Sequence, residues 1–170
     1  MNRRHLLRTG FAAALASPTL LRAQLAATVT PTTLAGSTLE GQPYDIKAEQ
    51  GKVVLVFFWS TDCAVCRDKM PELRLNYEAW RRKGFQLIAV SLDKSLAAVQ
   101  GYQGILDRMV PPAQRFPSLW RGAAAHRDSF GPMAQTPTTF VLDRQHQVVK
   151  EIRGRIPPGL WDDVAELVLA

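Results

Sequence analysis

Two cysteines, the only two in the chain, stand three positions apart as Cys63-Ala64-Val65-Cys66. A pair at this spacing can close a short disulfide, or it can offer one thiolate as a nucleophile and a second thiol to resolve the mixed disulfide that results. The pair follows a continuous apolar run over residues 53–60 and precedes a segment with apolar residues at three- to four-residue spacing. This pattern predicts that the cysteines lie where a buried strand ends and a helix begins.

That position favours a reactive thiol. The first turn of a helix has unpaired N–H groups and the positive end of the macrodipole, so a thiolate at Cys63 is stabilised there. Cys66 lies one turn further in, and we expect it to be more buried and to keep its proton longer. We therefore predict Cys63 as the attacking thiol and Cys66 as its resolving partner in thiol–disulfide exchange, which needs no cofactor.

Other uses of the pair are less consistent with the sequence. A structural disulfide stabilises most when it closes a long loop, and this one closes almost none. A structural zinc site needs about four ligands, and no second pair is present, so we expect no metal. A thiol peroxidase would carry a Pro-x-x-x-Thr-x-x-Cys pattern, whereas Ser60 stands three positions before Cys63 with no proline upstream. A copper-handling protein that uses the pair as metal ligands, joined by His126 or His146, remains the alternative.

Hydrophobic periodicity divides the rest of the chain into strands and helices. Strand–helix–strand units imply parallel strands, and a late hairpin adds antiparallel ones, so we expect an α/β fold with a mixed central sheet and helices on both faces. The expected elements are a hairpin over 38–46, strands over 53–60 and 85–92, a helix over 64–83 that contains Pro71, a helix over 95–109, an irregular stretch over 111–121, a short helix over 123–130, a hairpin of strands 138–142 and 147–153, and a final helix over 157–170.

The first 23 residues contain no Asp or Glu and are typical of an export signal. A basic stretch leads into a short apolar run over 11–21, and Ala23, Ala26 and Ala27 offer cleavage positions. The pair Arg3-Arg4, followed by Leu6-Leu7, resembles a bacterial twin-arginine signal. We expect residues 1–23 to be the signal, cleaved or kept as a membrane tether. Residues 24–37 are then a linker or an early edge strand, and residues 38–170 are the folded domain.

The net charge of +6 does not indicate a nucleic-acid partner. Four of the basic residues lie within the first 23 positions, and removing them leaves +2 for the remainder, where basic and acidic residues alternate. No stretch reaches the roughly 18 uninterrupted apolar residues of a membrane-spanning helix.

From about Thr38 onward, the chain resembles the TlpA-like (ResA-like) branch of exported thioredoxin-fold thiol–disulfide oxidoreductases. The pair and the strand before it match that branch, and so do a proline in the following helix and a Thr-Pro loop late in the chain. The matching residues are Gly51-Lys52-Val53-Val54-Leu55-Val56, Phe58-Trp59, Cys63, Cys66, Arg67, Met70-Pro71, Thr136-Pro137-Thr138-Thr139-Phe140, Asp143 and Gly154.

The resemblance implies a thioredoxin-like fold with an N-terminal hairpin and a central insertion over 100–130. It implies that Pro137 is cis, that backbone groups of Thr136 pair with an extended substrate segment, and that Trp59 lies beside the active site. It further implies a periplasmic, monomeric disulfide reductase that acts on protein substrates with disulfides or cysteine pairs. Such an enzyme is recharged by a membrane-embedded thiol-reductase electron donor.

Three positions depart from the family pattern. Asp62 replaces a tryptophan, and its carboxylate opposes the Cys63 thiolate and makes the pair more reducing, unless it serves only as a helix cap. Lys69 replaces a glutamate associated with cytochrome c maturation, which weakens the expectation of that role. Lys69 faces the side of Cys66 and favours its thiolate, unless it is simply a solvated lysine. Phe57 occupies the strand position where cytosolic thioredoxins bury a proton-accepting aspartate.

Overall fold

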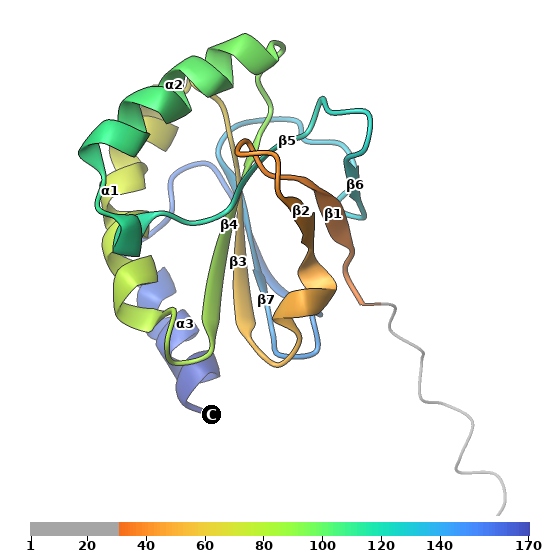
Figure 1. Ribbon diagram of the computed structural model, residues 1–170. Coiled ribbons are helices and arrows are strands. Elements are labelled where there is room, and N and C mark those ends of the chain that lie inside the picture. Colours follow the sequence, from red (N-terminus) through yellow and green to blue (C-terminus); the bar gives the residue numbers. More distant parts are fainter. Residues whose placement is uncertain (1–30) are drawn as a thin grey trace, which may run out of the picture.

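The computed structural model describes residues 31–170, which form two sheets and three α-helices (Figure 1). The predicted export signal, residues 1–23, lies outside the described residues, and so do residues 24–30 of the predicted linker. The elements in chain order are β1 Leu34–Ser37, β2 Pro43–Asp45, the 3-10 helix η2 Ile46–Glu49, β3 Val53–Trp59, α1 Ala64–Trp80, β4 Phe85–Ser91, α2 Leu96–Met109, the 3-10 helix η3 Pro112–Gln114, β5 Ser118–Trp120, β6 Arg127–Asp128, β7 Thr138–Leu142, β8 Val148–Arg153 and α3 Leu160–Leu169.

Strand β3 is the centre of the larger sheet, whose order is β5-β4-β3-β7-β8. It runs parallel to β4 and antiparallel to β7, so the predicted mixed sheet is confirmed. Every residue of β3 and β4 is buried, as their continuous apolar runs predicted for strands covered on both faces. The predicted hairpin late in the chain is also confirmed, as β7 and β8.

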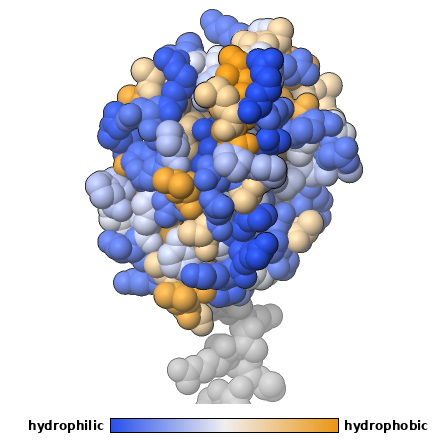
Figure 2. All heavy atoms as spheres, turned by 60° about the vertical axis from the view of Figure 1, so that its left-hand side comes forward, coloured by the Kyte–Doolittle hydropathy of each residue, from blue (hydrophilic) through white to orange (hydrophobic). Residues whose placement is uncertain are grey.

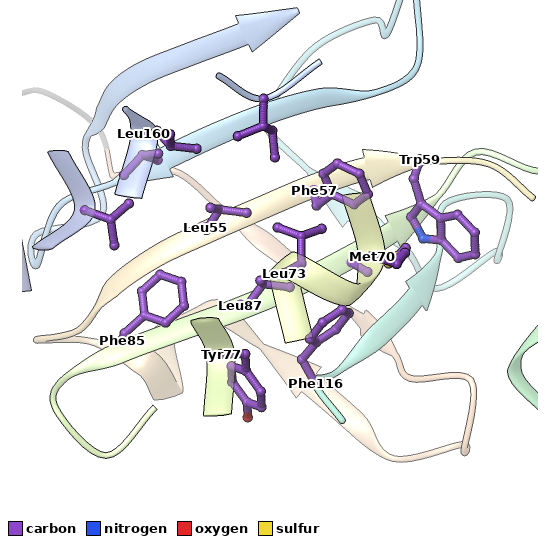
Figure 3. Close-up of a cluster of buried hydrophobic side chains, with 14 of the residues drawn as sticks. Leu55, Phe57, Trp59, Met70, Leu73, Tyr77, Phe85, Leu87, Phe116 and Leu160 are labelled. Carbon is purple, nitrogen blue, oxygen red and sulfur yellow. The ribbon is translucent and has the colours of Figure 1, made fainter. Parts of the chain in front are cut away.

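One face of this sheet carries all three α-helices (Figures 1 and 3). Leu55, Phe57 and Trp59 of β3 share one core with Met70 of α1 and Leu160 of α3. The same core includes a residue of α2, buried at the start of that helix. Each large apolar side chain buried in this way stabilises the fold by about 1.5–3 kcal/mol, so the core fixes the start of α1 against the end of β3.

The opposite face is covered by the small sheet of order β2-β1-β6 and by η2. Val56 and Phe58 of β3 pack there with Leu34 of β1 and Ile46 of η2. We expected helices on both faces of the sheet. On this face the only helix is the short 3-10 helix η2, among the residues that the structure describes. The N-terminal hairpin already supplies the apolar cover that a second layer of α-helices would provide.

Two segments differ from the sequence-based expectation. The short helix expected over residues 123–130 is wrong, because Arg127–Asp128 form β6, which pairs with β1 in the register Leu34 to Asp128. β1 itself occupies the last four residues of the 24–37 segment, where an early edge strand was one of the two alternatives. The stretch over 111–121, expected to be irregular, includes the edge strand β5. β5 and β6 each depend on a partner remote in sequence, which local periodicity does not reveal.

The outer surface of the helical side is mixed in character. Figure 2 shows orange apolar groups separated by hydrophilic side chains. Leu75, Ile105 and Met109 are among the large apolar residues exposed on α1 and α2. Scattered exposure of this kind is common on protein surfaces. Within residues 31–170, none of the helices has the length and apolar character needed to cross a membrane.

Candidate functional site

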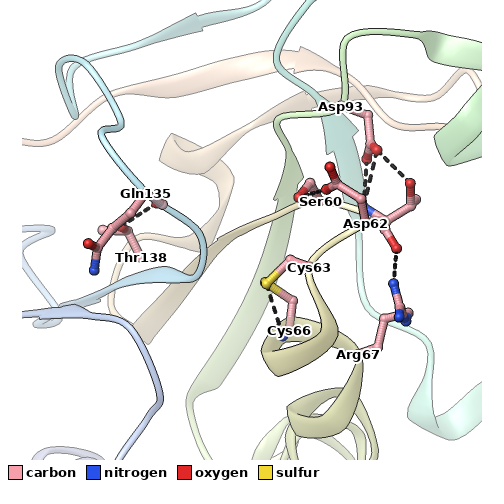
Figure 4. Close-up of a disulfide and its surroundings, with 9 residues drawn as sticks. Ser60, Asp62, Cys63, Cys66, Arg67, Asp93, Gln135 and Thr138 are labelled. Atoms are coloured by element: carbon pink, nitrogen blue, oxygen red, sulfur yellow. Dashed lines mark hydrogen bonds between the residues drawn. A yellow bond between two sulfur atoms is a disulfide. The ribbon is translucent and has the colours of Figure 1, made fainter.

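The two cysteines lie at the junction that the sequence predicted, between the end of β3 and the first turn of α1 (Figure 4). They form a disulfide, and their Cα atoms are 5.2 Å apart. Cys63 is the N-cap of α1, and its Sγ accepts a hydrogen bond of 3.1 Å from the backbone N–H of Cys66. Cys63 is partly exposed, whereas Cys66 is fully buried. Only the Cys63 sulfur is therefore placed for attack on, or by, a partner in solution.

A short turn joins β3 to the cysteines, and two charged side chains hold it (Figure 4). The carboxylate of Asp93 accepts hydrogen bonds from the backbone N–H and the hydroxyl of Thr61, at 3.1 Å and 2.6 Å. Arg67 of α1 donates to the carbonyl oxygen of Thr61 from the other side. Sequence reasoning missed Asp93. The available signal was that it follows β4, which is parallel to β3, because parallel neighbours end at the same edge of a sheet.

A groove beside this turn is lined by Thr136 together with residues that precede Cys63. Its lining combines residues of the turn, of the loop after β4, of the start of α2 and of the loop before β7. These residues are Ser60, Asp62, Leu92, Asp93, Lys94, Ser95, Ala98 and Thr136. The groove therefore lies beside the turn that leads to Cys63, and neither cysteine is among its lining residues.

The Thr136–Pro137 peptide bond is cis, as the family resemblance implied. Hydrogen bonds close the loop on both sides of Pro137. The Thr138 hydroxyl donates to the carbonyl of Gln135 at 2.9 Å, and the N–H of Gly154 donates to the carbonyl of Pro137 at 2.8 Å. The binding role expected of Thr136 and Pro137 stays a prediction.

The residues expected to tune the pair have different environments. Trp59 is buried, and its ring centroid lies 5.1 Å from that of Tyr102. Its indole N–H has no hydrogen-bond partner within the described residues. Asp62 accepts a hydrogen bond from the hydroxyl of Ser60, within the same turn. Phe57 shares the apolar core with Cys66, so no carboxylate occupies its place beside the buried thiol.

Lys69 is not a solvated lysine, because only 8% of its surface is exposed. Its ammonium group contacts the carboxylate of Glu72 at 2.8 Å, and Glu72 also accepts a hydrogen bond from the indole of Trp161. Partial burial by itself raises the pKa of Glu72, but the hydrogen bonds from Lys69 and Trp161 outweigh it and hold that pKa below its usual range. The positive charge of Lys69 on α1 is thus paired with the negative charge of Glu72.

The two histidines considered for copper have other surroundings. Nε2 of His126 lies 2.8 Å from the carboxylate of Asp128. His146 follows β7, whose last residue, Leu142, pairs with Val54 at the start of β3, so it lies at the sheet edge opposite the cysteines. Among residues 31–170, no group of three or more His, Cys, Asp or Glu side chains is arranged to hold a metal ion.

Asp128 lies at the centre of a polar cluster with His126 and Arg121. Its side chain is 4% exposed and accepts two hydrogen bonds of 2.8 Å from Arg121. Burial by itself raises the pKa of Asp128, but the hydrogen bonds with His126 and Arg121 outweigh it and lower that pKa to about 2. The guanidinium of Arg121 also lies 5.3 Å from the ring centre of Phe58. The cluster ties β6 to the sheet face that the helices do not cover.

The fold and the site define a thioredoxin-like protein with a Cys-x-x-Cys pair at the start of a helix. The sequence model of the Redoxin family matches residues 24–169, and the chain belongs to that family. The predicted resemblance to ResA-like proteins is confirmed by curated relatives. The thiol-disulfide oxidoreductase ResA of Bacillus thuringiensis subsp. konkukian (strain 97-27) is 30% identical over 116 residues, which cover 68% of this chain and 63% of the relative. The ResA of Bacillus subtilis (strain 168) is 24% identical over 128 residues, which cover 75% of this chain and 68% of the relative.

Solved structures confirm the predicted fold class. A thiol:disulfide interchange protein of Chlorobium tepidum TLS aligns with a TM-score of 0.65 at 22% identity, over 83% of this chain and 97% of its own. A secreted thiol-disulfide isomerase of Corynebacterium glutamicum aligns with a TM-score of 0.66 at 20% identity, over 83% of this chain and 86% of its own. The chain spans 63% of the length of the first of the ResA relatives described above.

Proposed function

We propose that the protein is an exported thiol–disulfide oxidoreductase that reduces disulfides in other proteins. One observation carries the proposal: a partly exposed Cys63 sulfur and a buried Cys66 sulfur are joined at the N-terminus of α1. Relatives named thiol-disulfide oxidoreductase support the same activity.

In the reduced protein, the Cys63 thiolate attacks one sulfur of a substrate disulfide. The substrate's disulfide bond breaks, a mixed disulfide forms, and the displaced substrate thiolate takes up a proton. Cys66 then loses its proton and attacks the Cys63 sulfur. The Cys63–Cys66 bond forms, and the second substrate thiol leaves. Two electrons and two protons have passed to the substrate, and the protein is left in the oxidised state that the structure shows.

Two features of the site support the direction of net electron flow. Asp62 and Asp93 place two carboxylates in the groove beside the turn that leads to Cys63, against the single ammonium group of Lys94 in the same lining. A nearby negative charge disfavours the thiolate, so it disfavours the reduced pair and makes the protein a better reductant. The positive charge of Lys69 does little to favour the thiolate, since Glu72 pairs with it.

Export and recharging belong to the same proposal. The arginine-rich first 23 residues support delivery to the periplasm, where disulfides form and persist. A reductase in that compartment needs a continuing supply of electrons. We infer a membrane-embedded dithiol donor that attacks the exposed Cys63 sulfur of the oxidised protein. The protein acts as a monomer on clients with disulfides or cysteine pairs.

Reduction of insulin in the presence of dithiothreitol tests the activity. We expect wild-type protein to accelerate insulin reduction and Cys63→Ser to abolish the acceleration. Cys66→Ser retains the attacking thiol, so it should accumulate a mixed disulfide with insulin that non-reducing gels and mass spectrometry detect. Undiminished turnover by Cys63→Ser would exclude the proposed mechanism.

A further inference from the structure

We propose that Asp93 is a positioning residue of the redox site, which holds the turn before Cys63 and biases the pair toward its oxidised form. This inference rests on the proposed exchange chemistry of the pair. Asp93 lies two residues beyond Ser91, the last residue of β4, and Thr61 lies two residues beyond Trp59, the last residue of β3. Trp59 and Ser91 are register partners in parallel strands, so both segments leave the sheet at the same edge.

The carboxylate of Asp93 is hydrogen-bonded on both oxygens. Both oxygens lie 3.1 Å from the backbone nitrogen of Thr61, and Oδ1 accepts the Thr61 hydroxyl at 2.6 Å. Oδ2 accepts the hydroxyl of Ser91 at 2.7 Å. The side chain therefore fastens the segment after β3 to the end of β4.

Asp93 is itself held in place by the neighbouring strand. The indole N–H of Trp120, the last residue of β5, donates to the Asp93 carbonyl at 2.7 Å. The N–H of Leu92 donates to the carbonyl of Trp59, also at 2.7 Å. These hydrogen bonds hold Asp93 in place relative to β4 and β5. The central insertion, which contains β5, therefore helps to position the turn before Cys63.

The turn is hydrogen-bonded directly to Cys63 and to the first turns of α1. The N–H of Cys63 donates to the carbonyl of Ser60 at 3.2 Å, and Arg67 donates to the carbonyl of Thr61. Thr61 is therefore held at its N–H by the anionic side chain of Asp93 and at its carbonyl by the cationic side chain of Arg67, both of which Figure 4 labels. A shift of Thr61 would move the Cys63 sulfur away from the N–H of Cys66, from which it accepts a hydrogen bond.

The charge of Asp93 adds an electrostatic effect to this geometry. Its carboxylate is hydrogen-bonded to Thr61, whose Cα atom is at most about 7.6 Å from that of Cys63. A carboxylate anchored to this turn opposes the thiolate that α1 stabilises. Asp93→Asn keeps the shape and an acceptor oxygen for Thr61 but removes the charge. Asp93→Ser removes the charge and shortens the side chain.

The electrostatic test uses the pair itself and needs no protein substrate. The absorbance of the thiolate near 240 nm is followed against pH in reduced protein, and the equilibrium constant with glutathione is measured. Asp93→Asn should move the thiolate transition to lower pH. It should also make the pair about tenfold easier to reduce by glutathione, which corresponds to about 30 mV. Asp162→Asn makes the same chemical change on the exposed side of α3 and should alter neither quantity.

The positional test measures hydrogen exchange of the Thr61 amide. Asp93→Ser should accelerate it at least about tenfold relative to wild type, because the carboxylate that accepts this N–H is gone. The inference is overturned if Asp93→Asn matches Asp162→Asn in both redox quantities, or if Thr61 exchange in Asp93→Ser is unchanged. If Asp93→Asn does not fold, Asp93→Ser carries the same redox prediction. If the wild-type protein does not accelerate insulin reduction, the proposed function is refuted. The thiolate, glutathione and hydrogen-exchange measurements still test the role of Asp93 in that case.

Discussion

The backbone N–H of Cys66 lies 3.1 Å from the Sγ of Cys63 and donates to it across the first turn of α1. When the disulfide is reduced, the same N–H is in place to stabilise a thiolate on Cys63, together with the positive end of the helix. Cys66 is fully buried, whereas Cys63 is partly exposed. The first turn therefore assigns different roles to two chemically identical side chains.

This asymmetry predicts selective alkylation. In reduced protein at neutral pH, iodoacetamide should label Cys63 at least about tenfold faster than Cys66, because the thiolate is the reactive form and only Cys63 is accessible. Peptide mapping by mass spectrometry after short exposures gives the two rates. Equal rates, or faster labelling of Cys66, would contradict the assignment. Protein unfolded in urea serves as the control in which the difference disappears.

The groove beside the turn predicts a distinction between large and small substrates. Ala98 lines the groove at the start of α2, whereas its exposed neighbour Ala97 does not. Ala98→Arg should raise the KM for insulin several-fold, because the longer side chain occupies space that a polypeptide needs. Its rate with hydroxyethyl disulfide, a small substrate, should stay within twofold of wild type. Ala97→Arg is the matched control, and an equal loss in both variants would show that the groove does not bind substrate.

The ion pair on α1 predicts unequal effects from its two members. Lys69→Met should change the glutathione equilibrium of the pair only slightly, since Glu72 already neutralises the lysine. Glu72→Gln leaves the ammonium charge uncompensated on the buried side of α1, which favours a thiolate at Cys66. That variant should be several-fold easier to reduce than wild type. The explanation is wrong if Lys69→Met shifts the equilibrium as far as Glu72→Gln does.

Asp128 predicts a specific acid sensitivity of the fold. Its pKa is about 2 in the folded protein and about 3.9 in an unfolded chain. The unfolded state therefore binds the proton more readily, and ionised Asp128 stabilises the fold above about pH 4. That stability, of the order of 2 kcal/mol, is lost as the pH falls from about 4 to 2.

Urea unfolding at a series of pH values tests this prediction. Asp128→Asn should be less stable than wild type at neutral pH and should lose less stability between pH 4 and pH 2. Glu166→Gln changes an exposed carboxylate on α3 and should keep the wild-type slope in that range. An unchanged slope in Asp128→Asn would show that another group carries the acid sensitivity.

Local patterns were sufficient to predict the elements that carry the cysteines. The run of buried residues in β3 and the apolar spacing of α1 placed Cys63 and Cys66 correctly at their junction. Long-range pairing was not visible in the same way. The local pattern over residues 123–130 predicts a helix where the structure has β6, because the partner of β6, Leu34 in β1, is remote in sequence. Local patterns do not indicate Asp93 either, because its partner Thr61 follows a different strand. The sequence does not show that Lys69 is 8% exposed and paired with Glu72, which in turn accepts a hydrogen bond from Trp161 of α3.

The reduction potential of the Cys63–Cys66 pair tests the central claim most directly. It can be measured by equilibration with glutathione buffers and quantified by alkylation of the free thiols. We predict a value nearer to about −270 mV, typical of thioredoxin, than to about −120 mV, typical of a strong oxidant. A value near −120 mV would contradict the assignment as a reductase. A value well below about −300 mV would mark the bond as a structural disulfide and contradict any exchange function.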